Sequence, residues 1–209
     1  MTRIPKQLEF VVDSIVNVFG VFASTIAMTV LIVLAIQFSS VDMTIAVVLY
    51  AVMVVLSFAL SAIYNLWPMT ELKSHLRKLD HAAIHLKIAG TYTPIIMLIG
   101  SVFSYVVLGL VWAAAIIGLI LKLTLKHWPD SWSVGVFLVQ GWAAAFLVWP
   151  MFETLQSTEF YLIIAGGLVY STGVIFHVRE DWMFHKALWH TFVLTGSSLF
   201  FLSVTMIAL

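Results

Sequence analysis

Seven long apolar runs divide the chain, and each is long enough to cross a lipid bilayer as a helix. A bilayer core of about 30 Å requires about 20 apolar residues in a helix that rises about 1.5 Å per residue. Because backbone groups in hydrocarbon must be hydrogen-bonded internally, these runs predict helices rather than strands. The predicted helices cover approximately residues 14–37, 44–66, 81–100, 102–122, 133–151, 160–178 and 187–208.

The composition agrees with a chain whose solvent is lipid. Of its 209 residues, 62% are hydrophobic and 10% are charged, whereas a soluble domain has about 45–50% apolar and about 25% charged residues. The net charge is zero, which argues against a nucleic-acid partner. The absence of cysteine excludes thiolate metal ligands and disulfides. The connections are too short for a second domain, so we expect one all-α, seven-helix membrane domain over residues 1–209.

The basic residues predict the orientation of this bundle. They lie before the first helix and in every second connection: Arg3, Lys6, Lys73, Arg77, Lys78, Lys122, Lys126, Arg179 and Lys186. The other connections contain Asp42, Glu153 and Glu159 but no Lys or Arg. Since Lys and Arg in short loops remain on the cytoplasmic side, we expect a multi-pass protein of the plasma membrane. Its N-terminus would be cytoplasmic and its C-terminus outside.

Three basic or titratable residues fall inside the third predicted helix. Lys87 lies seven residues after Asp80, nearly two full turns, and therefore on the same face. Its stem can snorkel to the membrane surface, or its ammonium can face the bundle interior and pair with a carboxylate or a lipid phosphate. His81 and His85 share a face at i,i+4, and for them we expect a surface or headgroup role.

Four polar residues near the predicted cytoplasmic helix ends form a candidate site. Asn65 ends the second helix, Asp80 precedes the third, and Lys186 and His190 lie at the start of the seventh. Ser61 lies one turn from Asn65 on the same face. Polar groups at membrane depth are costly and usually functional, so their convergence predicts a site. The alternative is that these residues only contact lipid headgroups.

Short segments spread over most of the chain form a recognisable set. They are SAIY at 61–64, KLDHAAI at 78–84, IAGTYTP at 88–94, VYS with GVIF between 169 and 176, and ALWH with FVL and GS between 187 and 197. With the seven-helix layout, they resemble the haemolysin III branch of the progestin and adipoQ receptor family. That family includes the adiponectin receptors.

The resemblance implies a zinc ion at the inner end of the bundle. Relatives hold it with one His on helix two and two on helix seven, and an Asp reaches the metal through water. The positions that match are Ser61, Asp80 and His190, whereas Asn65 and Lys186 replace two of the His ligands. An amide is a poor zinc ligand and an ammonium cannot coordinate, so we expect a degraded site.

Two substitutes for the missing ligands can be considered. His185 precedes His190 by five residues, about 140° around a helix, so His185 could join His190 and Asp80 at a metal only if the helix begins unwound. Alternatively, Lys186 replaces the metal and forms an ion pair with Asp80, bridged by Asn65. Without a compensating charge, the buried carboxylate would cost several kcal/mol.

Three functions remain open at this point. The first is a membrane protein that binds a lipid or acyl chain and acts in membrane homeostasis or signalling. The second is a zinc-dependent, ceramidase-like lipid amide hydrolase, in which Asp80 acts as a base and Ser61 stabilises the oxyanion. That enzyme requires His185 or His85 to restore metal binding. The third is a transporter or pore-forming haemolysin that uses His81, His85, Lys87 and Asp80.

Overall fold

Seven helical crossings make up the fold. The computed structural model describes residues 6–125 and 130–209, and the side chains of all of these except 130–133. The helices are α1 Lys6–Phe38, α2 Val41–Leu66, α3 Glu71–Ile99, α4 Val102–Thr124, α5 Asp130–Gly141, η1 Trp142–Leu147, α6 Val148–Thr154, α7 Ser157–Val178 and α8 His185–Ala208. Within these described residues, seven stretches are long and apolar enough to cross a membrane. This result confirms the predicted all-α membrane bundle.

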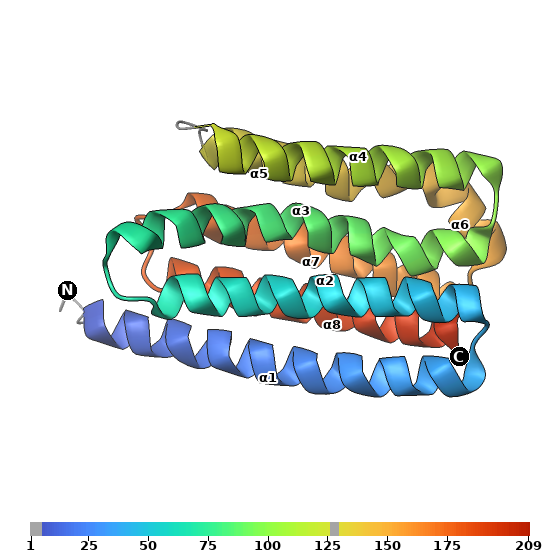
Figure 1. Cartoon of the computed structure of the whole chain (residues 1–209), viewed down its shortest axis with the longest axis horizontal. Helices are drawn as coiled ribbons and strands as arrows, with labels where there is room; N and C mark the ends of the chain where they lie inside the picture. The colour runs from blue at the N-terminus through green and yellow to red at the C-terminus, as the bar shows by residue number, and fades with distance from the viewer. Residues whose placement is uncertain (1–5, 126–129) are drawn as a thin grey trace.

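Helix α3 is the central helix of the bundle. The first four helices pack against one another in chain order, while α8 packs against both α7 and α1 (Figure 1). Of the most apolar stretch of α3, 61% of the residues are buried, against 17–39% for the other crossings. Side chains of α3 are therefore the ones that meet several neighbouring helices inside the bundle.

Two helices begin earlier than the apolar runs indicate. Helix α1 starts at Lys6 rather than 14, and α3 starts at Glu71 rather than 81. The 29 residues of α3 extend for about 43 Å, which is longer than the hydrocarbon core. Half of its first ten residues are exposed and none is fully buried, because a helix can continue into water with polar side chains. At its other end, Gly100 adopts the left-handed conformation that favours glycine.

The fifth crossing is interrupted, although the sequence predicts a single helix over 133–151. Pro150 cannot donate a backbone hydrogen bond, and the helix tightens to 3₁₀ geometry in η1 before α6. The Tyr92 hydroxyl of α3 enters this region. It donates to the Gly141 carbonyl at 2.6 Å and accepts from the Ala144 N–H at 2.6 Å. A side chain of the central helix therefore satisfies backbone groups that the irregular segment leaves free.

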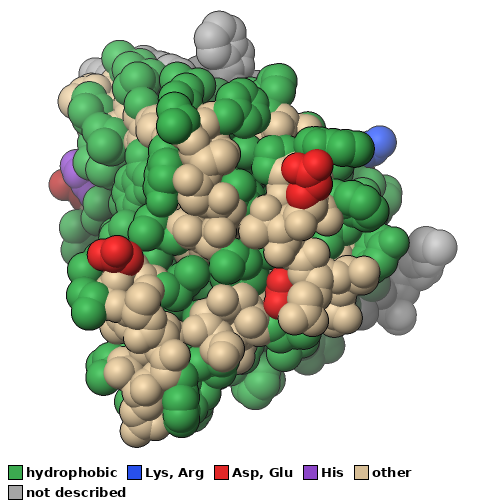
Figure 2. Space-filling view, turned by 90° about the vertical axis from the view of Figure 1, so that its right-hand side faces the viewer, with side chains coloured by type: hydrophobic (Ala, Val, Ile, Leu, Met, Phe, Trp, Pro, Cys, Tyr) green, Lys and Arg blue, Asp and Glu red, His purple; other side chains and the backbone are tan. Residues whose placement is uncertain are grey.

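The two ends of the bundle differ in charge. The basic end contains the α2–α3 and α7–α8 connections, with Lys73, Arg77, Lys78, Arg179 and Lys186. The acidic end contains the connections around residues 39–42, 100–101 and 154–157, and acidic side chains lie there among hydrophobic and neutral groups (Figure 2). Arg3 and Lys126 lie outside the described residues. The cytoplasmic placement of the basic end stays a prediction.

Candidate functional site

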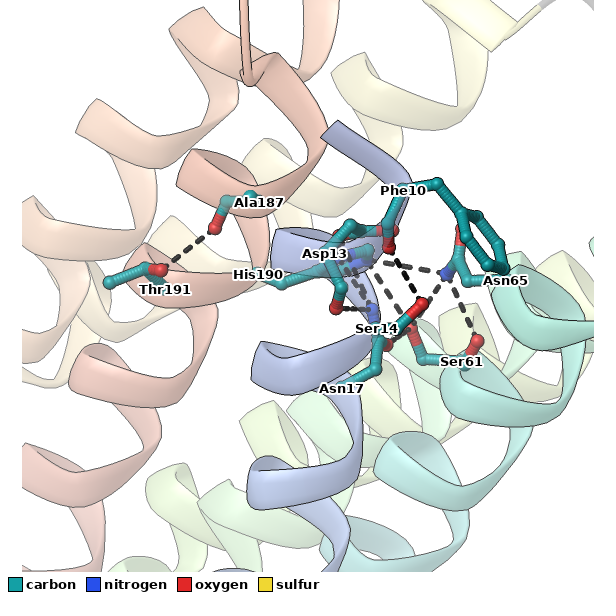
Figure 3. Close-up of polar contacts among 9 residues, drawn as sticks. All are labelled: Phe10, Asp13, Ser14, Asn17, Ser61, Asn65, Ala187, His190 and Thr191. Atoms are coloured by element: carbon teal, nitrogen blue, oxygen red, sulfur yellow. Dashed lines mark hydrogen bonds and ion pairs between the residues drawn. The ribbon is translucent and has the colours of Figure 1, made fainter. Parts of the chain in front are cut away.

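Polar side chains of four helices meet near the basic end of the bundle, and Figure 3 shows those of α1, α2 and α8. We call them the His190 cluster, and they come from α1, α2, α3 and α8: Asp13, Asn17, Ser61, Asn65, Asp80 and His190. The side chains of Asp13 and Asn17 are buried, as is that of Asn65. Because these groups lie between apolar helices, hydrogen bonds among the helices must replace those to water.

Asp13 fixes the orientation of the His190 ring. Its Oδ1 lies 2.6 Å from His190 Nδ1, a distance typical of a charge-assisted hydrogen bond. Asn17 lies beside this pair, and its amide donates to the Asp13 carbonyl at 2.9 Å. In a neutral imidazole whose one nitrogen donates to a carboxylate, the other nitrogen is an acceptor. His190 Nε2 is therefore the atom available to accept a proton or bind an ion.

The helix α2 residues face this free nitrogen. Ser61 Oγ lies 3.4 Å and Asn65 Nδ2 3.5 Å from His190 Nε2. Asn65 also donates to the Ser61 carbonyl at 2.9 Å. The Asn65 amide thus presents a donor nitrogen toward His190. The two α2 side chains can hold a neutral imidazole in place, but the amide nitrogen cannot share a metal with it.

Asp80 belongs to the cluster through its contact with Ser61, whereas Lys186 lies outside the cluster. A hydrogen bond connects Asp80 and Ser61, and the charges that act on Asp80 are those of His190, Lys87 and Arg77. The predicted Lys186–Asp80 ion pair is wrong. Lys186 is exposed, and within residues 6–125 and 130–209 it forms no ion pair with Asp80. An ammonium on a long flexible stem gains more from water than from a buried carboxylate that already has a hydrogen-bond donor.

The zinc ion that the resemblance implies does not fit these side chains. His190 is the one nitrogen ligand at the matched positions, and Asp80 is the one carboxylate. His185 does not join them, because α8 is regular from His185 onward and five residues place the two rings on different faces. In the described part of the chain, no group of three or more His, Asp or Glu residues is arranged to hold a metal.

An elongated cavity extends from the His190 cluster into the bundle. It has a volume of about 180 Å³, whereas one water needs about 10–15 Å³. Ser61, Asp80 and His190 line one end, and apolar residues such as Ile95, Leu147 and Met151 line the rest. Asp80 and Ile95 are fifteen residues apart on α3, which corresponds to about 22 Å along the helix. The space therefore has the length and the surface that a hydrocarbon chain requires.

The two histidines expected at the surface lie inside the bundle instead. His81 lines the cavity, and its ring meets that of His177 edge to face at 6.0 Å. His85 Nδ1 lies 2.7 Å from Gln140 Oε1, and the Gln140 amide donates to the His85 carbonyl at 3.1 Å. His85 therefore links α3 to α5. Both rings face inward because α3 is central and has neighbours on nearly every side.

Lys87 also faces the bundle interior rather than the membrane surface. Its side chain is buried, and it lines the cavity on the same face of α3 as Asp80. Of the two alternatives that the sequence leaves open, the inward orientation is therefore correct.

Asp13 and Asn17 are the functional candidates that sequence reasoning missed. Their spacing of four residues in an otherwise apolar segment, VVDSIVNVF, was a usable signal, because i,i+4 residues share a helix face. The predicted first helix began at residue 14, and this boundary left Asp13 in the aqueous N-terminal segment. With α1 starting at Lys6, both residues lie inside the helix, on the face that packs into the bundle.

Comparison with known proteins gives consistent relatives over nearly the whole chain. A family model described as haemolysin-III related matches residues 12–201. The chain is similar to Hemolysin-3 of Bacillus cereus, with 31% identity over 206 residues that cover 98% of this chain and 94% of the relative. It is also similar to the Hemolysin-3 homolog of Bacillus subtilis, with 32% identity over 197 residues that cover 94% and 92% of the two chains.

Proposed function

The chain belongs to the haemolysin III-related proteins of the progestin and adipoQ receptor family, and on that premise we propose that it binds a lipid acyl chain inside its helix bundle. In this role it acts in membrane homeostasis or signalling, as a multi-pass protein of the plasma membrane with a cytoplasmic N-terminus. The His190 cluster closes one end of the binding space and holds α1, α2, α3 and α8 together.

The cavity is the observation that supports this proposal. Its lining is almost entirely apolar over most of its length, with aromatic walls from Phe137, Trp142 and Phe200. Apolar cavities hold water poorly, so an acyl chain from the surrounding bilayer suits this lining better than water does. An acyl chain in the cavity would also supply the van der Waals contacts that the surrounding side chains lack when the cavity is empty.

A lipid amide hydrolase is the second candidate, because Ser61, Asp80 and His190 line the same cavity. An acyl chain in the cavity would place its head near His190 Nε2. A zinc mechanism would require more ligands than His190 and Asp80 supply. Metal content after purification in zinc-containing buffer, combined with release of fatty acid from an N-acyl amide, tests this candidate.

The name haemolysin, which both relatives carry, raises a pore or transporter as a third candidate. Asp80, His81 and Lys87 line the cavity at and near its polar end. Toward the acidic end, Ile95, Leu147 and Met151 replace them. An ion would meet no polar group in that apolar part, so lipid binding agrees better with the lining.

Two phenylalanine substitutions on α1 test the lipid proposal. Val16 lines the cavity, whereas Val18 is 41% exposed on the outside of the bundle. We expect Val16→Phe to fill part of the space and reduce copurified lipid about tenfold, as measured by native mass spectrometry. Val18→Phe is the matched control and should retain the lipid of the unmodified protein. Equal lipid occupancy in both variants, or none in the unmodified protein, would contradict the proposal.

A further inference from the structure

Two lysines from different helices lie at the basic end of the bundle, outside the cavity. Lys73 belongs to the first turn of α3 and Lys186 to the first turn of α8. The Lys73 Nζ donates to the Trp67 carbonyl at 2.9 Å and lies 5.5 Å from the Tyr64 ring centroid. Its ammonium is therefore held against the end of α2. Neither lysine lines the cavity, so a ligand between them would be separate from any chain inside the bundle.

The start of α8 lies next to this end of α2, which brings the two lysines together. Asn65 Nδ2, in the last turn of α2, lies 3.5 Å from His190 Nε2. Lys186 precedes His190 by one helical turn toward the basic end. The ammonium groups of Lys73 and Lys186 are near enough for the charge of one to act on the other. They form a pair of like charges contributed by α3 and α8.

No carboxylate of the described residues neutralises this pair. Neither Lys73 nor Lys186 forms an ion pair within 6–125 and 130–209. Glu9 of α1 reaches the start of α8, but its Oε1 accepts from the Phe184 N–H at 3.2 Å. Both lysines also occupy the first turn of a helix, where the macrodipole disfavours a cation. Like charges held together in such positions are unfavourable, so the arrangement indicates an anion that binds between them.

Apolar side chains beside the lysine pair indicate the depth of lipid headgroups. Trp67, Met69 and Leu72 lie at the connection between α2 and α3, and all three are exposed, Met69 by 89%. Exposed aromatic and apolar side chains next to lysines are typical of the membrane–water interface. Phospholipids carry their phosphate groups at this depth. The surroundings therefore favour a lipid over free phosphate as the source of the anion.

We propose that Lys73 and Lys186 bind a phosphate group at the basic end of the bundle, carried by an anionic phospholipid whose acyl chains lie along the outside of the helices. A phosphate matches the pair because its several oxygens can accept hydrogen bonds from both ammonium groups. Net negative charge is required, since the positive group of a zwitterionic headgroup would offset the attraction. This site does not depend on the proposed binding of an acyl chain in the cavity.

Binding of phosphatidylglycerol and phosphatidylcholine with identical dioleoyl chains to delipidated, purified protein tests this assignment by native mass spectrometry. We expect phosphatidylglycerol to bind about tenfold more tightly, because of the two only this lipid carries a net negative charge. Lys73→Met and Lys186→Met should each weaken its binding about fivefold. Lys6→Met is the matched control, because it removes an exposed ammonium from the same end and should leave the affinity nearly unchanged.

Measurements without lipid separate binding from a structural role. Lipid-free Lys186→Met should melt at the same or a higher temperature than the unmodified protein, because it removes repulsion from Lys73. A lower melting temperature with unchanged phosphatidylglycerol affinity would overturn the inference. Equal affinity of the unmodified protein for both lipids would overturn it too, as would an equal loss in Lys6→Met.

Inorganic phosphate distinguishes the two sources of the anion. We expect it to raise the melting temperature of the unmodified protein less than phosphatidylglycerol does at the same concentration. An equal rise that disappears when Lys73 and Lys186 are both replaced by Met would support the phosphate site and assign it to free phosphate. An equal rise that persists in this double variant would overturn the site.

Discussion

Asp13 connects α1 to α8 through a single short contact with His190, and the stability of the cluster depends on it. Replacing Asp13 by Asn removes the carboxylate charge but retains the size of the side chain. Since weakening one partner of a buried hydrogen bond costs about 1–3 kcal/mol, we expect a lower melting temperature for Asp13→Asn in detergent. Asp42→Asn, which changes an exposed carboxylate, should shift it far less. Similar shifts for both variants would show that the Asp13–His190 contact contributes nothing specific.

Some residues of the site were predictable from the sequence, and others were not. Ser61, Asn65, Asp80 and His190 were predicted to converge, because polar side chains near helix ends of one orientation share a depth. The proposed role of Lys186 failed for a physical reason. The position of Lys186 one turn from His190 does not determine where its side chain points. A flexible ammonium at the start of a helix reaches water more easily than the bundle interior.

Tyr92 determines how the interrupted fifth crossing is held against α3. Tyr92→Phe would remove the hydrogen bonds to Gly141 and Ala144 and leave backbone groups in the membrane unsatisfied. We expect a cost of about 1–3 kcal/mol and faster hydrogen exchange at residues 141–148. Tyr161→Phe provides the control, because Tyr161 is 64% exposed and its ring faces outward. If hydrogen exchange at 141–148 is unchanged in Tyr92→Phe, the hydroxyl does not hold this segment.

Element boundaries were predictable only where they coincide with the membrane boundary. The apolar runs located all seven crossings, because hydrocarbon imposes a length on every one of them. They did not locate the start of α3 at Glu71, since polar residues continue a helix in water without any change in hydropathy. They also did not predict η1, which requires a tertiary contact from Tyr92 that lies about fifty residues away in the chain.

The arrangement of the seven crossings could not be predicted from the sequence. The apolar runs identify α3 as one crossing among seven and do not order the crossings in space, although the lower hydropathy of α3, 1.4, sets it apart from the others. A polar helix among apolar ones indicates a central position, because its side chains need protein rather than lipid as neighbours. This reasoning would have placed His81, His85 and Lys87 in the interior and not at the surface.

The orientation of the whole molecule can be tested directly, because the chain contains no cysteine. Single cysteines at Asp42 and Glu153 would report on the acidic end, and cysteines at Ser74 and Glu180 on the basic end. All four positions are exposed. Since basic loops stay cytoplasmic, a membrane-impermeant maleimide should label the first pair in intact cells and the second pair only after permeabilisation. The reverse pattern would place the His190 cluster at the outer surface and overturn the cytoplasmic assignment of the N-terminus.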